Sequence, residues 1–448
     1  MNEKKLATHP LVAAYLEEVC SHVKAKDVHN DIASELLGHL LERVEDLMEL
    51  EQLGEEEAIA SAVRGMGDAR EVGIGLNAAH KPKTEWSVVV IFAVMFLLAV
   101  VALFALPAGF IDMTTKLIIV LAGLLFMVAA YFGNYQKLAR WSWWLYAITI
   151  GVMYYTLLFG TQINGAKEWL SIGKLTFNLG EVSPYLLIVA IAGILYIERS
   201  KPRSTQLMSS VKIFAQLVAF ILLPMLVYML TPTMINLAVY MFGLFVLFIV
   251  YGKWRFMLAA AGTLITGIVL LLSFNGGQLH YIIFRLTTMF SNDPHANYQA
   301  LRSVEAIQAG GLWGQGIGVP NPKLPFIYSE MMYAYLVYSL GWIFGTIVVL
   351  AVIAFVWRTI RMGLRTKDMY GRSLIVGVCS IFGIRLLWNL LMCLGIVPIF
   401  GIGLPILQLS SVTILEFGLI GFMLGVYRRK DMISQQQDQG FQSSLTKS

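Results

Sequence analysis

Ten apolar segments, each near the length that crosses a membrane, constrain the fold of this chain more than any other feature. A helix of about 20 residues spans the ~30 Å hydrocarbon core of a bilayer. Only 14% of the residues are charged, whereas soluble domains average about 25%. The sequence therefore predicts an all-α polytopic membrane protein with a ten-helix membrane domain over residues 86–430. The spans are expected at about 86–108, 116–133, 141–160, 181–198, 211–231, 234–251, 255–274, 332–357, 373–396 and 408–427.

Lysine and arginine residues are distributed unevenly between the loops that join these segments. If the N-terminus is cytoplasmic, sixteen of them fall in inner loops and six in outer loops. Because cytoplasmic loops carry an excess of basic residues, both termini are expected in the cytoplasm. The polar loops at 161–180 and 275–331 would then face outward. This topology also accounts for the net charge of +5, so no nucleic-acid partner is expected.

The region before the first span, residues 1–80, is predicted to form a small cytoplasmic domain of three helices. Two amphipathic helices follow from apolar residues at helical spacing. The third covers the sequence EEEAIASAVRGMG and stops at Gly65 and Gly67. The domain is either a solvated bundle without a ligand or a regulatory docking module. It is similar to the helical prefix domains of some Gram-positive bacterial membrane proteins.

Three further features concern the start of the chain, its cysteines and its tail. No apolar stretch long enough for a signal peptide precedes Trp86, so the first span is expected to act as an uncleaved insertion signal. The spacing of Cys20, Cys379 and Cys393 predicts neither a metal site nor a disulfide framework. The polar tail at 431–448 is expected to be disordered.

A glycine-rich stretch beginning at Gly310, GGLWGQGIGVPNPKLPFIYSEMMYAYLVYSLGW, contains a lone carboxylate, Glu330. A carboxylate where a loop enters a membrane helix costs free energy to keep, which marks it as a functional candidate. The alternative is that Glu330 caps the following helix, because an acid near a helix N-terminus favours the dipole. Position along the chain leaves both interpretations open.

Three segments of the predicted outer face resemble motifs of the FtsW/RodA/SpoVE (SEDS) family. NGAKEWLSIGKLTFNLGE, from Asn164 to Glu181, is similar to the family's NGA-basic-basic-W loop that ends in a QPSE-like sequence. The stretch from Tyr298 to Trp342 is similar to YQ…AIGSGG-x-x-G-x-G followed by LPE-x-HTDFIF. GIVPIFGIGLPILQLSS, from Gly395 to Ser411, follows GLLPVTGIPLPFISYGGSS.

The resemblance implies a membrane glycosyltransferase that polymerises lipid II into peptidoglycan on the outer side of the bacterial cytoplasmic membrane. Family members serve cell shape, division or sporulation and work with a class B penicillin-binding protein. Glu330 occupies the position of the family's essential aspartate, which makes it the expected catalytic residue. A carboxylate there could take a proton from the attacking sugar hydroxyl, or help to hold a divalent cation such as Mg²⁺ or Mn²⁺ against the diphosphate.

Several other residues are expected to bind the substrate. Lys167 and Lys174 could face the diphosphate, since an ammonium is an effective point charge for phosphate. Alternatively, these lysines snorkel to lipid headgroups. The glycines of the loop are expected to allow tight turns near the sugar. The expected substrate-binding set is Lys167, Trp169, Lys174, Gln299, Arg302, Gly314, Gly316 and Ser329.

The chain departs from the family pattern at several charged positions. A basic residue of the NGA loop is replaced by Glu168, a lysine by Pro184, and an acidic pair by Tyr338 and Ser339. These losses raise a second hypothesis, a catalytically weakened or inactive scaffold that regulates a penicillin-binding protein. A transporter of lipid-linked precursors is a third, which the clustering of informative residues on the outer face disfavours.

Two charged residues fall near the middle of predicted spans. Arg385 lies about twelve residues into the ninth span, and Glu416 about nine residues into the tenth. An unpaired charge at that depth costs several kcal/mol, so the two are expected to form a structural ion pair.

Overall fold

The computed structural model of the chain describes residues 3–24, 29–79, 84–107, 112–163, 166–173, 175–199, 206–231, 233–274, 283, 287 and 297–430. These residues form two compact units. The first contains the helices before Thr84, and the second runs from Glu85 to Tyr427. The tail predicted to be disordered, 431–448, lies outside the described residues, as does Lys174.

The N-terminal unit has more helices than the three expected. Its helices are α1 (Glu3–Ala7), α2 (Pro10–Ser21), α3 (His29–Leu50), α4 (Glu55–Gly65) and α5 (Ala69–Ala79). The prediction missed α1 and α5. After α4 the chain turns at Gly67, whose φ is 88°, and Asp68 starts α5 by accepting from the amides of Arg70 and Glu71 at 2.9 and 3.1 Å. An aspartate at this position satisfies N–H groups that a helix start leaves unpaired.

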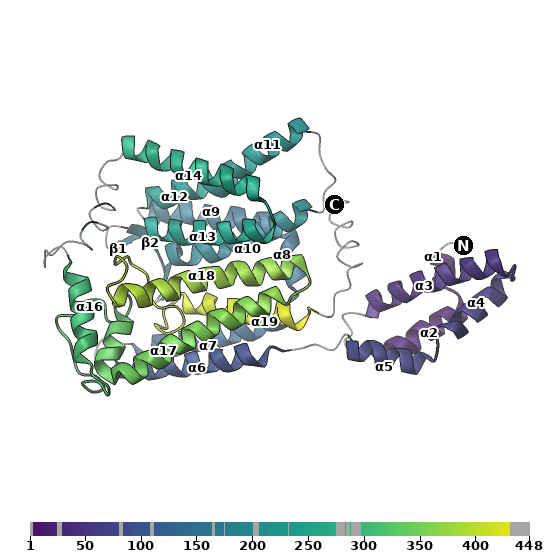
Figure 1. The fold of residues 1–448 in the computed structure, drawn as a ribbon, viewed down its shortest axis with the longest axis horizontal. Helices are drawn as coiled ribbons and strands as arrows, with labels where there is room; N and C mark the ends of the chain where they lie inside the picture. Colours follow the sequence, from purple (N-terminus) through teal and green to yellow (C-terminus); the bar gives the residue numbers. More distant parts are fainter. Residues whose placement is uncertain are drawn as a thin grey trace. The chain divides into compact units, whose positions relative to one another are not determined.

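The second unit is a bundle of apolar helices, as expected. Seven of the described helices have the length and composition to cross a membrane, and shorter apolar helices accompany them (Figure 1). Each predicted span coincides with a helix, which confirms the all-α polytopic fold. The elements are α6 (Trp86–Ala105), α7 (Met113–Phe132), α8 (Tyr135–Arg140), α9 (Ser142–Phe159), α10 (Leu179–Arg199), α11 (Gln206–Leu217), η2 (Val218–Leu222), α12 (Leu223–Leu230), α13 (Met234–Val250), α14 (Trp254–Phe274), α16 (Tyr298–Ala309), α17 (Met332–Leu364), α18 (Met369–Cys393) and α19 (Thr413–Arg428).

Helix α10 is the most enclosed of the seven candidate spans among the described residues, and most of its side chains are buried. It packs against α9, α13 and α18. Pro184 within α10 has no N–H to donate to the carbonyl of Gly180. The hydroxyl of Ser183 donates to that carbonyl at 3.3 Å, so the acceptor stays satisfied away from water.

The fifth span is interrupted by a π-helical turn, η2, ahead of Pro224. Pro224 leaves the carbonyl of Phe220 without its usual donor. The hydroxyl of Tyr240, from α13, donates to that carbonyl at 2.5 Å. The hydroxyl of Tyr146, from α9, donates to the neighbouring carbonyl of Ala219. Neighbouring helices thus satisfy the broken backbone, as a membrane span requires.

Helices α7 and α19 approach closely because glycines of α19 face the backbone of α7. A Cβ atom at Gly421 would lie 2.1 Å from the carbonyl oxygen of Met127, and one at Gly425 would lie 2.6 Å from that of Tyr131. No side chain fits at such distances unless the two helices separate. Small residues at helix contacts are a general means of close packing in membranes.

Replacing Gly421 with alanine is therefore expected to lower the unfolding free energy by about 1–3 kcal/mol, the usual cost of overpacking. The measurement is thermal unfolding of the purified protein in detergent. Gly262→Ala in α14 is the matched control, because a Cβ there meets nothing within 4 Å, and it should be neutral or slightly stabilising. Equal stability of the two variants would contradict the close contact.

The loop at 161–180 is more ordered than expected, because it folds into a small antiparallel sheet. The strands are β1 (Thr161–Ile163), β2 (Ala166–Ile172) and β3 (Leu175–Asn178), in the order β1-β2-β3. Figure 1 shows the sheet and α16 at the same end of the bundle, where α17 begins. We call this the Glu330 end.

Helix α17 contains a break that the sequence did not predict. At Gly341 the backbone has φ 85° and ψ 173°, which joins two helical pieces at a kink. The segment expected to span the membrane from residue 332 therefore changes direction near its start (Figure 1). The long piece, 342–364, remains sufficient to cross the bilayer.

Candidate functional site

Glu330 lies in the turn that precedes α17, half-buried at the Glu330 end of the bundle. The N-cap position of α17 is occupied by Met331, so Glu330 is not the cap residue. The backbone carbonyl of Glu330 accepts from Asn389 Nδ2 at 3.0 Å and from the thiol of Cys393 at 3.5 Å. Both donors come from α18, so this helix fixes the position of the turn.

Asn389 joins two segments that are distant in the sequence. Its Nδ2 donates to the carbonyl of Glu330 and, at 2.7 Å, to the carbonyl of Ile402. The side chain is fully buried, and the nitrogen provides two hydrogens for two acceptors. A Cβ at Gly401 would lie 3.2 Å from Glu330 Oε1. The segment after Gly395 that resembles the third family motif therefore runs directly beside the carboxylate.

The chain from Gly401 to Val412 is an irregular, mostly buried loop. Ile406 and Leu409 have positive φ angles of 69° and 46°, which cost a non-glycine residue roughly 1–3 kcal/mol each. Side chains from two spans hold the loop in this conformation. Glu416 Oε2 accepts from the amide of Ile406 at 2.7 Å, and Lys116 Nζ donates to the carbonyls of Gln408 and Leu409 at 3.2 and 2.8 Å.

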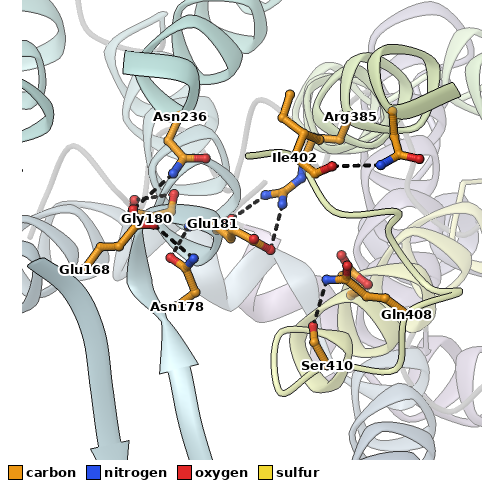
Figure 2. Close-up of polar contacts among 12 residues, drawn as sticks. Glu168, Asn178, Gly180, Glu181, Asn236, Arg385, Ile402, Gln408 and Ser410 are labelled. Carbon is orange, nitrogen blue, oxygen red and sulfur yellow. Dashed lines mark hydrogen bonds and ion pairs between the residues drawn. The ribbon is translucent and has the colours of Figure 1, made fainter. Parts of the chain in front are cut away.

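Arg385 was predicted to form an ion pair with Glu416, and this predicted partner is wrong. Arg385 is buried and its Nη2 lies 2.7 Å from Glu181 Oε2, while Nη1 donates to the carbonyl of Glu181 at 3.1 Å (Figure 2). Packing of α10 against α18 places Glu181, in the first turn of α10, beside Arg385. Glu416 instead uses one oxygen to hold the loop at Ile406.

A second carboxylate lies close to this ion pair. Figure 2 shows Glu168, on β2, between Asn178 and Asn236. Asn178 donates to its Oε1 at 3.1 Å and Asn236 to its Oε2 at 3.3 Å. Burial, together with the negative charge of Glu181, raises the pKa of Glu168 to about 7. The carboxyl is therefore partly protonated near neutral pH.

This raised pKa predicts a pH-dependent stability. Because the pKa of Glu168 is higher in the folded protein than its ordinary value of 4.5, its protonated form stabilises the fold below about pH 4.5. That contribution is lost as the pH rises towards 7, so the melting temperature should fall over this range. Glu168→Gln should make this fall in melting temperature shallower, whereas Glu57→Gln, at an exposed position, should leave it unchanged. An identical slope in Glu168→Gln would contradict the assignment.

The other predicted substrate residues are spread over the Glu330 end. Lys167 is exposed on β2, and Trp169 pairs with Asn178 in the sheet. Gln299 and Arg302 lie on α16. Ser329 is half-buried in the same turn as Glu330.

Arg302 already has local partners. Its Nη1 lies 2.5 Å from Glu305 Oε2, and its guanidinium stacks 4.9 Å from the ring centre of Tyr298. It would have to exchange Glu305 for a ligand in order to bind one.

Gly314 and Gly316 have a structural role in the loop that follows α16. Gly316 donates to the carbonyl of Ser339 at 3.1 Å and accepts from the Ser339 hydroxyl at 2.8 Å. A Cβ at Gly314 would lie 2.1 Å from the same carbonyl oxygen. Ser339, where the family pattern has an acid, thus supports this loop.

Asn389, Asn236 and Lys116 were missed as site residues by the sequence reasoning. The available signal was that Asn236 and Asn389 are amides inside apolar spans, where polar side chains need a partner. In the part of the chain that the structure describes, no three acidic, histidine or cysteine residues gather to hold a metal ion.

Several curated proteins are similar to this chain at modest identity. Stage V sporulation protein E of Bacillus subtilis is 27% identical over 307 residues, which cover 66% of this chain and 81% of that protein. Peptidoglycan glycosyltransferase MrdB of Escherichia coli K12 is 26% identical over 308 residues, covering 66% of this chain and 80% of that protein.

Solved structures share the fold. A chain from a structure reported as structural coordination of polymerization and crosslinking by a peptidoglycan synthase complex matches with a TM-score of 0.64 and 20% identity, covering 78% of this chain and 98% of that one. The rod shape determining protein RodA of Thermus thermophilus matches with a TM-score of 0.56 and 18% identity, covering 78% and 97%. A family model described as cell cycle protein, FtsW/RodA/SpoVE, matches residues 82–431. The chain therefore belongs to the FtsW/RodA/SpoVE family.

Proposed function

We propose that this chain is a peptidoglycan glycosyltransferase that polymerises lipid II. The curated relatives named as peptidoglycan glycosyltransferases support the activity. The observation that carries the proposal is that Glu330 lies against the loop after Gly395. Asn389 holds the two together, because it donates a hydrogen bond to each. A carboxylate held at the junction of two motif segments supports this role, because a general base needs a fixed position from which to reach the proton that it takes.

In the proposed reaction Glu330 takes the proton of the acceptor sugar hydroxyl. That oxygen attacks the anomeric carbon of the donor, and a new glycosidic C–O bond forms. The bond from the anomeric carbon to the diphosphate breaks, and the lipid-linked diphosphate leaves with the electron pair. The second role proposed for Glu330 is to help hold a divalent cation such as Mg²⁺ or Mn²⁺ against the diphosphate, because Mg²⁺ needs only one or two protein carboxylates beside substrate phosphates.

The substrate contacts follow from the same proposal. The exposed Lys167 would meet the diphosphate, helped by Lys174, and Trp169 would pack against a sugar face. Gln299 and Arg302 would contact the substrate from α16, and Ser329 from the turn beside Glu330. Gly314 and Gly316 would act indirectly, by holding the glycine-rich loop against α17.

For location, we propose a multi-pass protein of the cytoplasmic membrane of a Gram-positive bacterium, with both termini in the cytoplasm. The unequal distribution of basic residues supports this orientation, in which the Glu330 end would face outward. We also propose a class B penicillin-binding protein as partner, which agrees with a structural match from a peptidoglycan synthase complex.

A scaffold without catalysis is the second candidate function. It is favoured by Tyr338 and Ser339, which stand where the family pattern has acids and whose carbonyls bind the glycine-rich loop. The purified protein, supplied with lipid II with and without a class B penicillin-binding protein, separates the two. Glycan polymer on a gel supports the enzyme. The absence of polymer under every partner condition would favour the scaffold.

A further inference from the structure

Three large apolar side chains point away from the protein on the glycine-rich loop at 310–318. The exposed fractions are 66% for Leu312, 81% for Trp313 and 70% for Ile317. Exposed apolar side chains that cluster on a soluble surface normally mark an interaction site. Here they lie on a loop at the Glu330 end, beside the outer limits of two membrane spans.

The loop is held firmly to both spans by backbone hydrogen bonds. The amide of Gly318 donates to the carbonyl of Ala105, the last residue of α6, at 3.0 Å. The amide of Trp342, the first residue after the kink of α17, donates to the carbonyl of Gly311 at 2.9 Å. The amide of Gln315 donates to the carbonyl of Tyr338 at 2.8 Å. A loop attached at three points keeps its apolar side chains in a fixed direction.

The kink at Gly341 makes this attachment possible. A Cβ at Gly341 would lie 2.2 Å from the carbonyl oxygen of Leu312, so the two backbones touch. The φ of 85° at Gly341 turns the chain and leaves the amide of Trp342 free to bond outside its own helix. Glycine is the residue that allows both features.

The exposed side chains of the loop continue an apolar stripe on α17. Ile343, Ile347, Leu350, Ile353 and Trp357 are exposed on that helix, at the three- and four-residue spacing of one helical face. The backbone of Ile343 donates to the carbonyl of Leu312 at 3.5 Å, so the stripe and the loop are adjacent. A stripe of this kind on a membrane helix faces lipid.

We propose that Leu312, Trp313 and Ile317 insert into the interfacial region of the bilayer and anchor the Glu330 end at a fixed depth. The partner is the phospholipid surface, which tryptophan favours because its ring is apolar and its N–H reaches polar headgroups. The loop is bonded to the short helical piece that follows Glu330, so the anchor also sets the height of that carboxylate. Only this last consequence rests on the proposed function.

The test measures depth, so its outcome does not depend on enzyme activity. A nitroxide is attached at Trp313→Cys in a Cys20→Ser background, because Cys379 and Cys393 are buried. The full chain is placed in vesicles of phosphatidylglycerol and phosphatidylethanolamine. Ile347→Cys on α17 serves as the lipid reference, and Gln308→Cys, exposed on α16, as the water reference. Accessibility is measured with dissolved oxygen and with a water-soluble nickel chelate.

The label at 313 is expected to resemble the one at 347. At both positions the ratio of oxygen accessibility to chelate accessibility should be several-fold higher than at position 308. A label at 313 that matches position 308 would overturn the proposal. Shielding from both reagents would also overturn it, because that result means that protein covers the loop. A second variant, which carries no label, guards against disturbance by the label. Brominated lipid quenches the emission of tryptophans that lie in the bilayer, and the quenched part of the emission should be smaller in Trp313→Phe than in the unaltered protein.

Discussion

Glu330→Gln is expected to reduce lipid II polymerisation by about 10²- to 10⁴-fold, the usual contribution of a general base. Glutamine keeps the size of the side chain, but it replaces one acceptor oxygen with an NH₂ donor and cannot accept the proton. The backbone carbonyl of Glu330, which Asn389 and Cys393 bind, is unchanged by the substitution. The fold should therefore survive, and thermal unfolding of the variant checks this.

The assay follows the length and amount of glycan polymer made from lipid II by purified protein with its penicillin-binding protein partner. Glu71→Gln, at an exposed position of the N-terminal unit, is the control and should retain full activity. Glu330→Asp keeps the carboxylate but withdraws it by one methylene. Because a displacement of about 1 Å can cost ~100-fold in rate, intermediate activity is expected. Polymer undiminished in Glu330→Gln would remove this residue from the mechanism.

Asn389→Ala is expected to damage both stability and activity, because one amide serves two segments. The carbonyls of Glu330 and Ile402 would lose buried donors at 3.0 and 2.7 Å. The carbonyl of Glu330 would keep only the weak thiol donor of Cys393, and the carbonyl of Ile402 would lose its side-chain donor. An orphaned buried acceptor costs about 1–3 kcal/mol and a weakened one less, so the free energy of unfolding should fall by roughly 2–4 kcal/mol. Misplacement of the turn should reduce the rate by about 100-fold.

Ser380→Ala is the matched control for this prediction. Ser380 lies on the same helix, and its hydroxyl bonds only to the carbonyl of Gly377 within that helix according to the described contacts. Its loss should change stability and turnover little. Thermal unfolding and the polymerisation rate, measured on both variants, decide the matter. If Asn389→Ala behaves like Ser380→Ala, the amide does not position the turn.

The membrane spans could be predicted because the length and apolarity of a segment determine whether it crosses a bilayer. Their ends could be predicted less well. The tenth span was expected from residue 408, whereas α19 starts at Thr413. The residues before it are mostly buried, but Ile406 and Leu409 adopt positive φ angles that interrupt a helix. Hydropathy does not distinguish a buried loop from a buried helix.

The contacts within the candidate site could also be predicted only in part. The motif segments could be identified from the sequence, and the structure brings two of them together at Asn389. The partner of Arg385 could not be identified, because it depends on which helices pack side by side. Depth along a span suggested Glu416, whereas the contact between α10 and α18 provides Glu181. Distance from the membrane surface fixes one coordinate, and the packing of the helices fixes the other two.

The enclosure of α10 has a consequence for biosynthesis. Glu181 and Arg385 are separated by 204 residues, so α10 is inserted well before the helix that neutralises its carboxylate exists. At a synthesis rate of about 5–20 residues per second, the interval is roughly 10 to 40 seconds. During it Glu181 has to be protonated or remain near water at the membrane surface. The carboxylate of α10 is thus neutralised by its partner only after α18 has been inserted. A chain truncated before α18 should therefore be removed by membrane quality control.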